Sequence, residues 1–413
     1  MGTISIVLAA IDDDDTKSHT LVSSTTTNDL KIFSLKAHVY KVAYFLILLP
    51  RISELVPVHD YSSLQRRTSF GATMWTTTAS ALLGAFLVLA AMQGHTAASE
   101  APLLEVSGFS WVENIVFDGH GNLWASEATL GQLWRVHLTE DGSAWNKTLV
   151  LEGFRHVDGL AVTDDGTTLY AIAQWHNQSH AGEALVVSVQ TDTLAVNDYS
   201  VVAVTPELPN GMKRNLVTGK LYLTVEGPEF LPTQGKAYEV DIESGKVTVI
   251  LKDFFWSDGI AMDHPQQLLY IGELMTGKIY MYNMSSGEAQ GFFHDGLDAD
   301  QLQWLDDFFV DNDCTSIVGA GYSEGVLVRF QAGVDTHPNA TVLATGLTNP
   351  TAVLWGPLGD ESAAAGFRST SLYVTEGGGF TDKVVNRRIV EVPNMRAAPP
   401  AETKCWNYRV GLG

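Results

Sequence analysis

Residues 257–273 read SDGIAMDHPQQLLYIGE and contain the pattern from which the architecture of this chain follows. A short polar residue, Asp258, stands eleven residues before the apolar pair Leu269-Tyr270. The pattern recurs with these polar anchors: Glu113, Asp158, Asn210, Asp258, Asp306 and Asn349. The anchors are 45, 52, 48, 48 and 43 residues apart. One supersecondary unit of roughly 40–50 residues therefore occurs six times, which is typical of propeller blades.

Each repeat also contains a later run in which apolar and polar residues alternate, as in a strand with one buried face. These runs are Leu133–Val136, Leu185–Val189, Ala237–Ile242, Ile279–Tyr282, Val326–Phe330 and Ile389–Val392. The last repeat ends after its third strand, whereas Pro102–Phe109 reads as a strand without a repeat. Pairing the two would remove two exposed edges. We predict an all-β fold, a six-bladed β-propeller over residues 101–394, whose last blade is closed by the N-terminal strand and followed by a tail, 395–413.

The composition favours a folded protein and argues against some partners. Hydrophobic residues make up 45% of the 413 residues and charged residues 17%. The net charge is −22, and the first 98 residues contain seven acids and seven bases, so the excess lies on the repeats. Such a surface repels nucleic acid and anionic membranes and is compatible with divalent cations or small neutral substrates. An acidic surface that only maintains solubility fits equally well.

Residues 74–98 resemble a secretory signal peptide, with an apolar stretch, Ala79–Met92, before the small residues Thr96-Ala97-Ala98. The 73 residues before it contain no repeat, and we expect them to be a leader or gene-model extension, unstructured, with translation starting at Met74. The alternative is a signal anchor, with Arg66 and Arg67 on the cytoplasmic side.

Four glycosylation sequons favour a secreted, extracellular glycoprotein. They begin at Asn146, Asn177, Asn283 and Asn339. The chain has two cysteines, Cys314 and Cys405, and an oxidising compartment would permit a bridge between them. Two unpaired thiols are the alternative.

The anchors point to a metal site. If each begins the innermost strand of its blade, four carboxylates and one amide surround the central axis: Glu113, Asp158, Asn210, Asp258 and Asp306. Small polar residues also fit a crowded channel, and Asp-Gly or Asn-Gly is an ordinary turn signal. Carboxylates gathered so closely must raise their pKa values or bind a cation. Because all the donors are oxygen atoms, we expect a hard divalent ion, most simply Ca²⁺.

Several motifs resemble the senescence-marker-protein, gluconolactonase and luciferin-regenerating family of six-bladed propellers. They are Glu113 in Val-Glu-Asn, Asn210-Gly211, Ser257-Asp258-Gly259, and Asn349-Pro350-Thr351 leading to Leu372-Tyr373-Val374-Thr375. The resemblance implies that Glu113, Asn210 and Asp258 hold a divalent metal. It also implies hydrolysis of lactones or related esters in the central channel, where the metal polarises the carbonyl group and Asp258 helps to activate water.

The second blade departs from the family pattern Arg-x-Asn-Asp-Gly, because it reads Arg155-His156-Val157-Asp158-Gly159. Arg155 and Asp158 remain as expected substrate-binding residues, and Asp158 is either a substitute ligand or a turn residue. The loss of the amide at Val157 suggests a substrate more apolar than a sugar lactone. His156, His176 and His180 are candidate bases, although surface loops explain them as well.

Two other functions compete with a secreted hydrolase. The first is a non-catalytic binding propeller with a structural calcium ion. The second is a strictosidine-synthase-like enzyme, which shares the architecture without this metal set. We expect a small-molecule lactone or ester as the substrate, and no nucleic-acid partner or stable membrane association.

Overall fold

The structure is a computed structural model. It describes residues 103–175, 182–193, 195–227, 234–294, 304–311, 314–331, 340–358, 360–378 and 387–395. The expected leader, signal peptide and C-terminal tail lie outside these ranges. Among the described residues, none of the helices has the length and apolar character needed to cross a bilayer. Cys314 is disulfide-bonded, and the chain's other cysteine, Cys405, lies outside the described residues.

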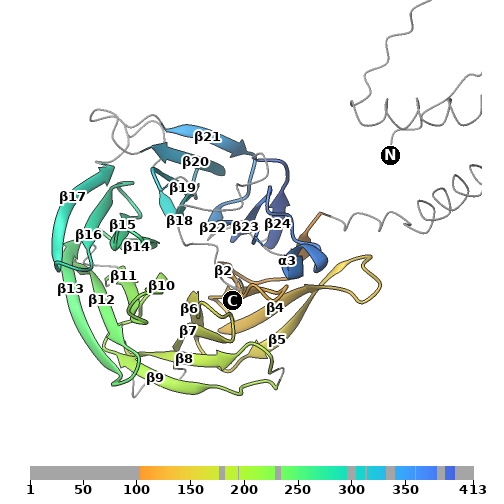
Figure 1. Cartoon of the computed structure of the whole chain (residues 1–413), viewed down its shortest axis with the longest axis horizontal. Helices are drawn as coiled ribbons and strands as arrows, with labels where there is room; N and C mark the ends of the chain where they lie inside the picture. The colour runs from red at the N-terminus through yellow and green to blue at the C-terminus, as the bar shows by residue number, and fades with distance from the viewer. Residues whose placement is uncertain are drawn as a thin grey trace, which may run out of the picture. The chain divides into compact units, whose positions relative to one another are not determined.

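The described residues form six antiparallel sheets of four strands, arranged around one axis as a six-bladed propeller (Figure 1). The predicted fold class is confirmed. Blade 1 contains β2 (Val112–Phe117), β3 (Leu123–Glu127), β4 (Gln132–Leu138) and β5 (Trp145–Leu151); blade 2 contains β6 (His156–Val162), β7 (Thr168–Gln174), β8 (Ala184–Gln190) and β9 (Ser200–Thr205); blade 3 contains β10 (Met212–Arg214), β11 (Leu221–Val225), β12 (Gly235–Asp241) and β13 (Lys246–Phe254).

The remaining blades follow the same order. Blade 4 contains β14 (Ser257–Asp263), β15 (Leu268–Glu273), β16 (Ile279–Asn283) and β17 (Glu288–His294); blade 5 contains β18 (Leu305–Val310), β19 (Ser316–Gly321), β20 (Val326–Gln331) and β21 (Thr341–Thr345); blade 6 contains β22 (Pro350–Trp355), β23 (Leu372–Glu376), β24 (Arg388–Val392) and β1 (Glu105–Ser107). A short helix, α3 (Asp360–Ala364), lies between β22 and β23.

A β-bulge turns the anchor side chains towards the axis. In five blades the ladder between the first and second strands shifts register at the anchor, for example between Val112 and Ile115 and between Ser257 and Ile260. The bulge bends the innermost strand and re-aims the side chain that it contains. In blade 6 the shift lies between Pro350 and Val353. The position equivalent to Glu113 is therefore Thr351, and the sequence alignment that placed this anchor at Asn349 is two residues too early.

The glycine after an anchor permits neighbouring blades to approach closely. A Cβ atom on Gly159 would lie 2.5 Å from the carbonyl oxygen of Asn210, and one on Gly259 would lie 2.4 Å from that of Asp306. The amide of Gly159 donates a hydrogen bond of 2.8 Å to the same Asn210 oxygen. These glycines therefore do more than form turns, because each lets one innermost strand contact the next.

The N-terminal strand closes the last blade, as predicted. β1 pairs antiparallel with β24, and Val106 is opposite Ile389. The amide of Leu104 donates to Glu391 Oε2 at 3.0 Å, while Arg388 Nη1 lies 2.7 Å from Glu105 Oε1. Val106 is buried in the core between blades 6 and 1, whereas its neighbour Ser107 is exposed.

The two faces of β1 provide a matched test of this closure. Val106→Asp places a charge in the apolar core and should lower the free energy of unfolding by at least ~3 kcal/mol. Ser107→Asp introduces the same group on the exposed face and should change it by less than ~0.5 kcal/mol. Urea denaturation of the two variants measures both values, and equal effects would contradict the closure by β1.

Candidate metal and substrate site

The polar anchors of blades 1 to 5 line one cavity of about 550 Å³ at the axis. These residues are Glu113, Asp158, Asn210, Asp258 and Asp306. The four acids are all buried, and the most exposed of them retain 7% of their surface. Glu113 and Asp258 thus line the same cavity, although they are 145 positions apart in the chain. The geometric convergence expected of the anchors is present, while their chemical roles stay predictions.

Burial and mutual repulsion keep these acids from ionising easily. Burial and, to a smaller extent, the Glu226 charge raise the pKa of Asp158 to about 8. For Asp258 the same two causes, in the same order, raise the pKa well above its ordinary value. Burial, followed by the Asp158 charge, does so for Glu113, against a hydrogen bond from Trp111. Without a cation, the cavity therefore contains several carboxyl groups that favour their protonated form.

Two of the candidate ligand oxygen atoms have no hydrogen-bond partner among the described residues. Asn210 Oδ1 and Asp258 Oδ1 are buried, and neither has a hydrogen-bond partner in the described part of the chain. The Asn210 amide is oriented, because its Nδ2 donates to Glu226 Oε1 at 2.9 Å. Trp111 Nε1 donates to Glu113 Oε2 and so positions the third candidate ligand. A buried oxygen without a donor is unfavourable, and a cation bound between such oxygens would remove that cost.

The donor set therefore fits a hard divalent cation, and Ca²⁺ accepts such a mixture of carboxylate, amide and water oxygens. The set consists of two carboxylates and one amide. Within the described ranges there is no group of three or more His, Cys, Asp or Glu side chains that could hold a metal ion. The candidate site of Glu113, Asn210 and Asp258 therefore needs the Asn210 amide as its third ligand. Neither Asp158 nor Asp306 forms a group of three acids with Glu113 and Asp258 that could hold the ion.

The predicted residues of the second blade separate into two groups. Arg155, His156 and Asp158 line the cavity, and Arg155 is exposed at its rim. Val157 is fully buried in the apolar core shared by blades 1 and 2. Its side chain does not belong to the cavity, and the more apolar substrate suggested by the missing amide stays a prediction. His176 and His180 lie outside the described residues.

Three aromatic residues of the described ranges line the cavity: Trp111, Trp304 and Tyr322. Tyr322 stacks on Trp304 with ring centres 5.7 Å apart and on Trp111 with ring centres 6.2 Å apart. We call these three rings the aromatic ladder. A signal existed, because Trp111 and Trp304 each precede an anchor by two residues, but Trp256 does so too and lies elsewhere.

Glu226 and Gln174 also line the cavity. Gln174 ends β7, and Glu226 directly follows β11. The sequence contains no signal for Gln174, because a single Gln at a strand end is not part of a distinctive motif. Its position becomes informative only after the blades are superimposed in register.

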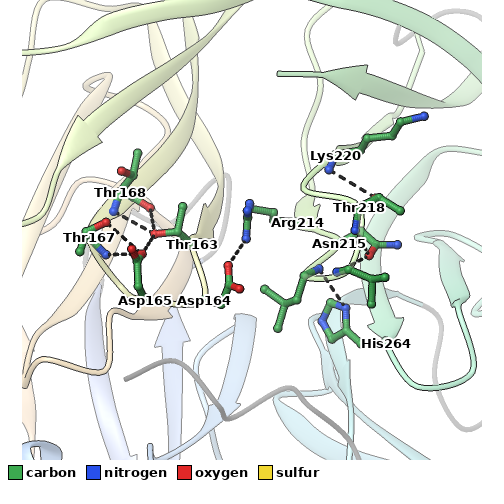
Figure 2. Close-up of polar contacts among 12 residues, drawn as sticks. Thr163, Asp164, Asp165, Thr167, Thr168, Arg214, Asn215, Thr218, Lys220 and His264 are labelled. Atoms are coloured by element: carbon green, nitrogen blue, oxygen red, sulfur yellow. Dashed lines mark hydrogen bonds and ion pairs between the residues drawn. The ribbon is translucent and has the colours of Figure 1, made fainter. Parts of the chain in front are cut away.

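Arg214 and His264, which lie beyond the anchors in the chain, have partners within the protein. Arg214, at the end of β10, pairs with Asp164 at 2.6 Å, and the amide of Leu216 donates to His264 Nδ1 at 3.4 Å (Figure 2). Arg214 and His264 line a second cavity of about 120 Å³, with apolar residues that follow the anchors along the strands. Burial lowers the pKa of His264 to about 4. The gathering of acids is thus confined to one part of the channel.

No protein-family model matches the sequence, and no curated protein does either. Solved structures do match. A luciferin-regenerating enzyme is 12% identical with a TM-score of 0.54, and the match covers 74% of this chain and 99% of that one. Regucalcin from Agrobacterium tumefaciens, a calcium-binding protein, is 17% identical with a TM-score of 0.51, covering 70% and 95%. The chain has the fold of these proteins. The fold that the sequence resemblance implies is therefore confirmed.

The same fold occurs in an auxiliary nutrient binding protein from Bacteroides thetaiotaomicron. It is 12% identical with a TM-score of 0.51, and the match covers 69% of each chain. At such identities the likeness concerns the fold alone, so the function must be argued from the cavity.

The raised pKa values predict how the stability of the metal-free protein depends on pH. Asp158 ionises near 3.8 when unfolded and near 8 when folded, so the folded state binds more protons between these values. Stability should therefore fall as pH rises from 5 to 8. Thermal melting in a chelator checks this, and Asp158→Asn should show a smaller fall. A melting temperature that rises over this range, or an unchanged slope in the variant, would contradict the assignment.

Proposed function

We propose that this protein is a metal-dependent hydrolase of lactones or related esters. The observation that carries the proposal is the convergence of Glu113, Asn210 and Asp258 on one cavity, with Asn210 Oδ1 and Asp258 Oδ1 lacking partners in the described part of the chain. A volume of about 550 Å³ suits a small molecule, because ligand pockets span roughly 300–1,000 Å³.

Glu113, Asn210 and Asp258 would hold the divalent cation, most simply Ca²⁺. When bound, such an ion polarises a carbonyl group and stabilises the negative charge that develops on its oxygen. The regucalcin structure with the same fold is that of a calcium-binding protein, which supports the choice of ion without establishing it for this chain.

The side chains of the cavity would divide the remaining work. Asp258 would accept a proton from the water that attacks the carbonyl carbon, as a carboxylate within reach of water can do. Arg155, at the rim, would orient the carbonyl group and the carboxylate product through its guanidinium group. Asp158, which lines the same cavity, would bind a polar group of the substrate.

We further propose that the protein is secreted. The segment 74–98 and the four sequons support this. Asn146 lies on the outermost strand of blade 1 and is exposed, and Asn283 is partly exposed at the end of β16. The net charge of −22 supports a small molecule as the partner and argues against nucleic acid.

Removing a candidate ligand should abolish both calcium binding and turnover. Glu113→Gln and Asp258→Asn should each lower kcat/KM towards a lactone panel by about 100-fold or more, because the cation contributes several kcal/mol of transition-state stabilisation. Isothermal titration of calcium should show the same loss of binding.

Asp307→Asn is the matched control. Asp307 is a buried acid next to Asp306 that the cavity does not include, so this variant should retain its calcium requirement. Undiminished activity in Glu113→Gln or Asp258→Asn would contradict the proposed site. Calcium-dependent melting without turnover of any lactone or ester would instead support a binding propeller.

A further inference from the structure

The position that ends the second strand has the same structural task in three blades. Glu127 in blade 1, Glu273 in blade 4 and Glu376 in blade 6 occupy it. Each carboxylate accepts a backbone N–H from the residue three positions before the anchor of its own blade. The donors are Ser110 for Glu127, Phe255 for Glu273 and Thr348 for Glu376. These bonds hold the chain as it enters the innermost strand.

Blade 2 has no carboxylate at this position, because the residue in the same register is Ala173, and Gln174 follows it. The equivalent backbone N–H belongs to Arg155 and donates to the main-chain oxygen of Gln174 at 2.8 Å instead. Gln174 lines the axial cavity, and only 8% of its surface is exposed. Its Oε1 lacks a hydrogen-bond partner among the described residues. A buried amide oxygen without a donor costs about 1–3 kcal/mol unless a ligand satisfies it.

The aromatic ladder lies across the cavity from Gln174. Trp304 and Tyr322 belong to blade 5, which is opposite blade 2 in a ring of six, and Trp111 belongs to blade 1. The outer face of Trp111 is covered by Arg387, whose guanidinium carbon is 5.6 Å from the ring centre. Tyr322 is enclosed between two indoles. Among the described contacts, the face of Trp304 that is turned away from Tyr322 is therefore the flat apolar surface that the ladder leaves uncovered.

We propose that Gln174 and the aromatic ladder select the substrate, and that the substrate is a lactone or ester with a flat ring that bears a hydroxyl group. The ring stacks on the uncovered face of Trp304, because offset aromatic pairs are favourable beyond the burial of their area. The hydroxyl group donates a hydrogen bond to Gln174 Oε1. This inference rests on the proposed function for the ester or lactone group, whereas the recognition by Gln174 does not require turnover.

The test compares dihydrocoumarin with its monohydroxylated derivatives. In the calcium-loaded wild-type protein, the best hydroxylated derivative should exceed the parent compound by about tenfold or more in kcat/KM, since one satisfied buried acceptor is worth about 1.4 kcal/mol. Gln174→Met, which keeps the length and removes the acceptor, should abolish the preference. Gln174→Glu, which retains an acceptor oxygen, should keep it.

Two readouts make the result independent of activity and of folding. Titration calorimetry with the corresponding non-hydrolysable lactams should show the same preference in the wild type and its loss in Gln174→Met. If no lactone is turned over but the lactam preference behaves in this way, the hydrolase function fails and the recognition by Gln174 stands. Gln174→Met should also melt no lower than the wild type, because the lost oxygen makes no bond within the described structure. Equal discrimination by the wild type and Gln174→Met, or no preference for the hydroxyl group, would overturn the inference.

Discussion

Close approach of the innermost strands around one axis is the constraint on which the rest of this molecule depends. Each strand must contact the next within a small circle, and the contacts are specific. The Gly159 amide bonds to the Asn210 carbonyl group, and the Thr351 hydroxyl group lies 2.9 Å from the Val112 carbonyl oxygen. Only small residues fit beside such contacts, as the glycines that follow three anchors show. In blades 1, 2, 4 and 5 the bulge at the anchor then leaves one acidic side chain facing the cavity.

This geometry accounts for a concentration of acids that no local preference would produce. Burial raises the pKa values of these carboxylates most, and their mutual repulsion raises them further. Burial lowers the pKa of Lys213, and the Asp307 carboxylate acts in the opposite direction. This internal charge lies beside Asp307, which the cavity does not include. The negative charge of the axial acids must therefore be neutralised by protons or by an added cation. This requirement links the fold to the proposed chemistry.

The repeats made much of this predictable from sequence. Fixed spacing located the innermost strands, and the unpaired run before Glu113 indicated how the ring closes. The bulges were not predictable, because a register shift arises from pairing with the second strand. Consequently the sequence did not reveal that Val157 faces the core, or that Thr351 is the anchor of blade 6. Gln174 and Tyr322 were missed as cavity residues for a related reason. Each follows by one residue the second-strand position whose carboxylate is structural in blades 1, 4 and 6.

The central claim is that the axis is built to bind one cation. A crystal structure of the protein grown with calcium tests this most directly. The account predicts one ion at the axis, bound by Glu113 and Asp258 carboxylate oxygens and by Asn210 Oδ1 at about 2.3–2.6 Å, with water in the remaining positions. An axis that contains only water at saturating calcium, or an ion bound elsewhere while Asn210 and Asp258 remain without partners, would contradict it.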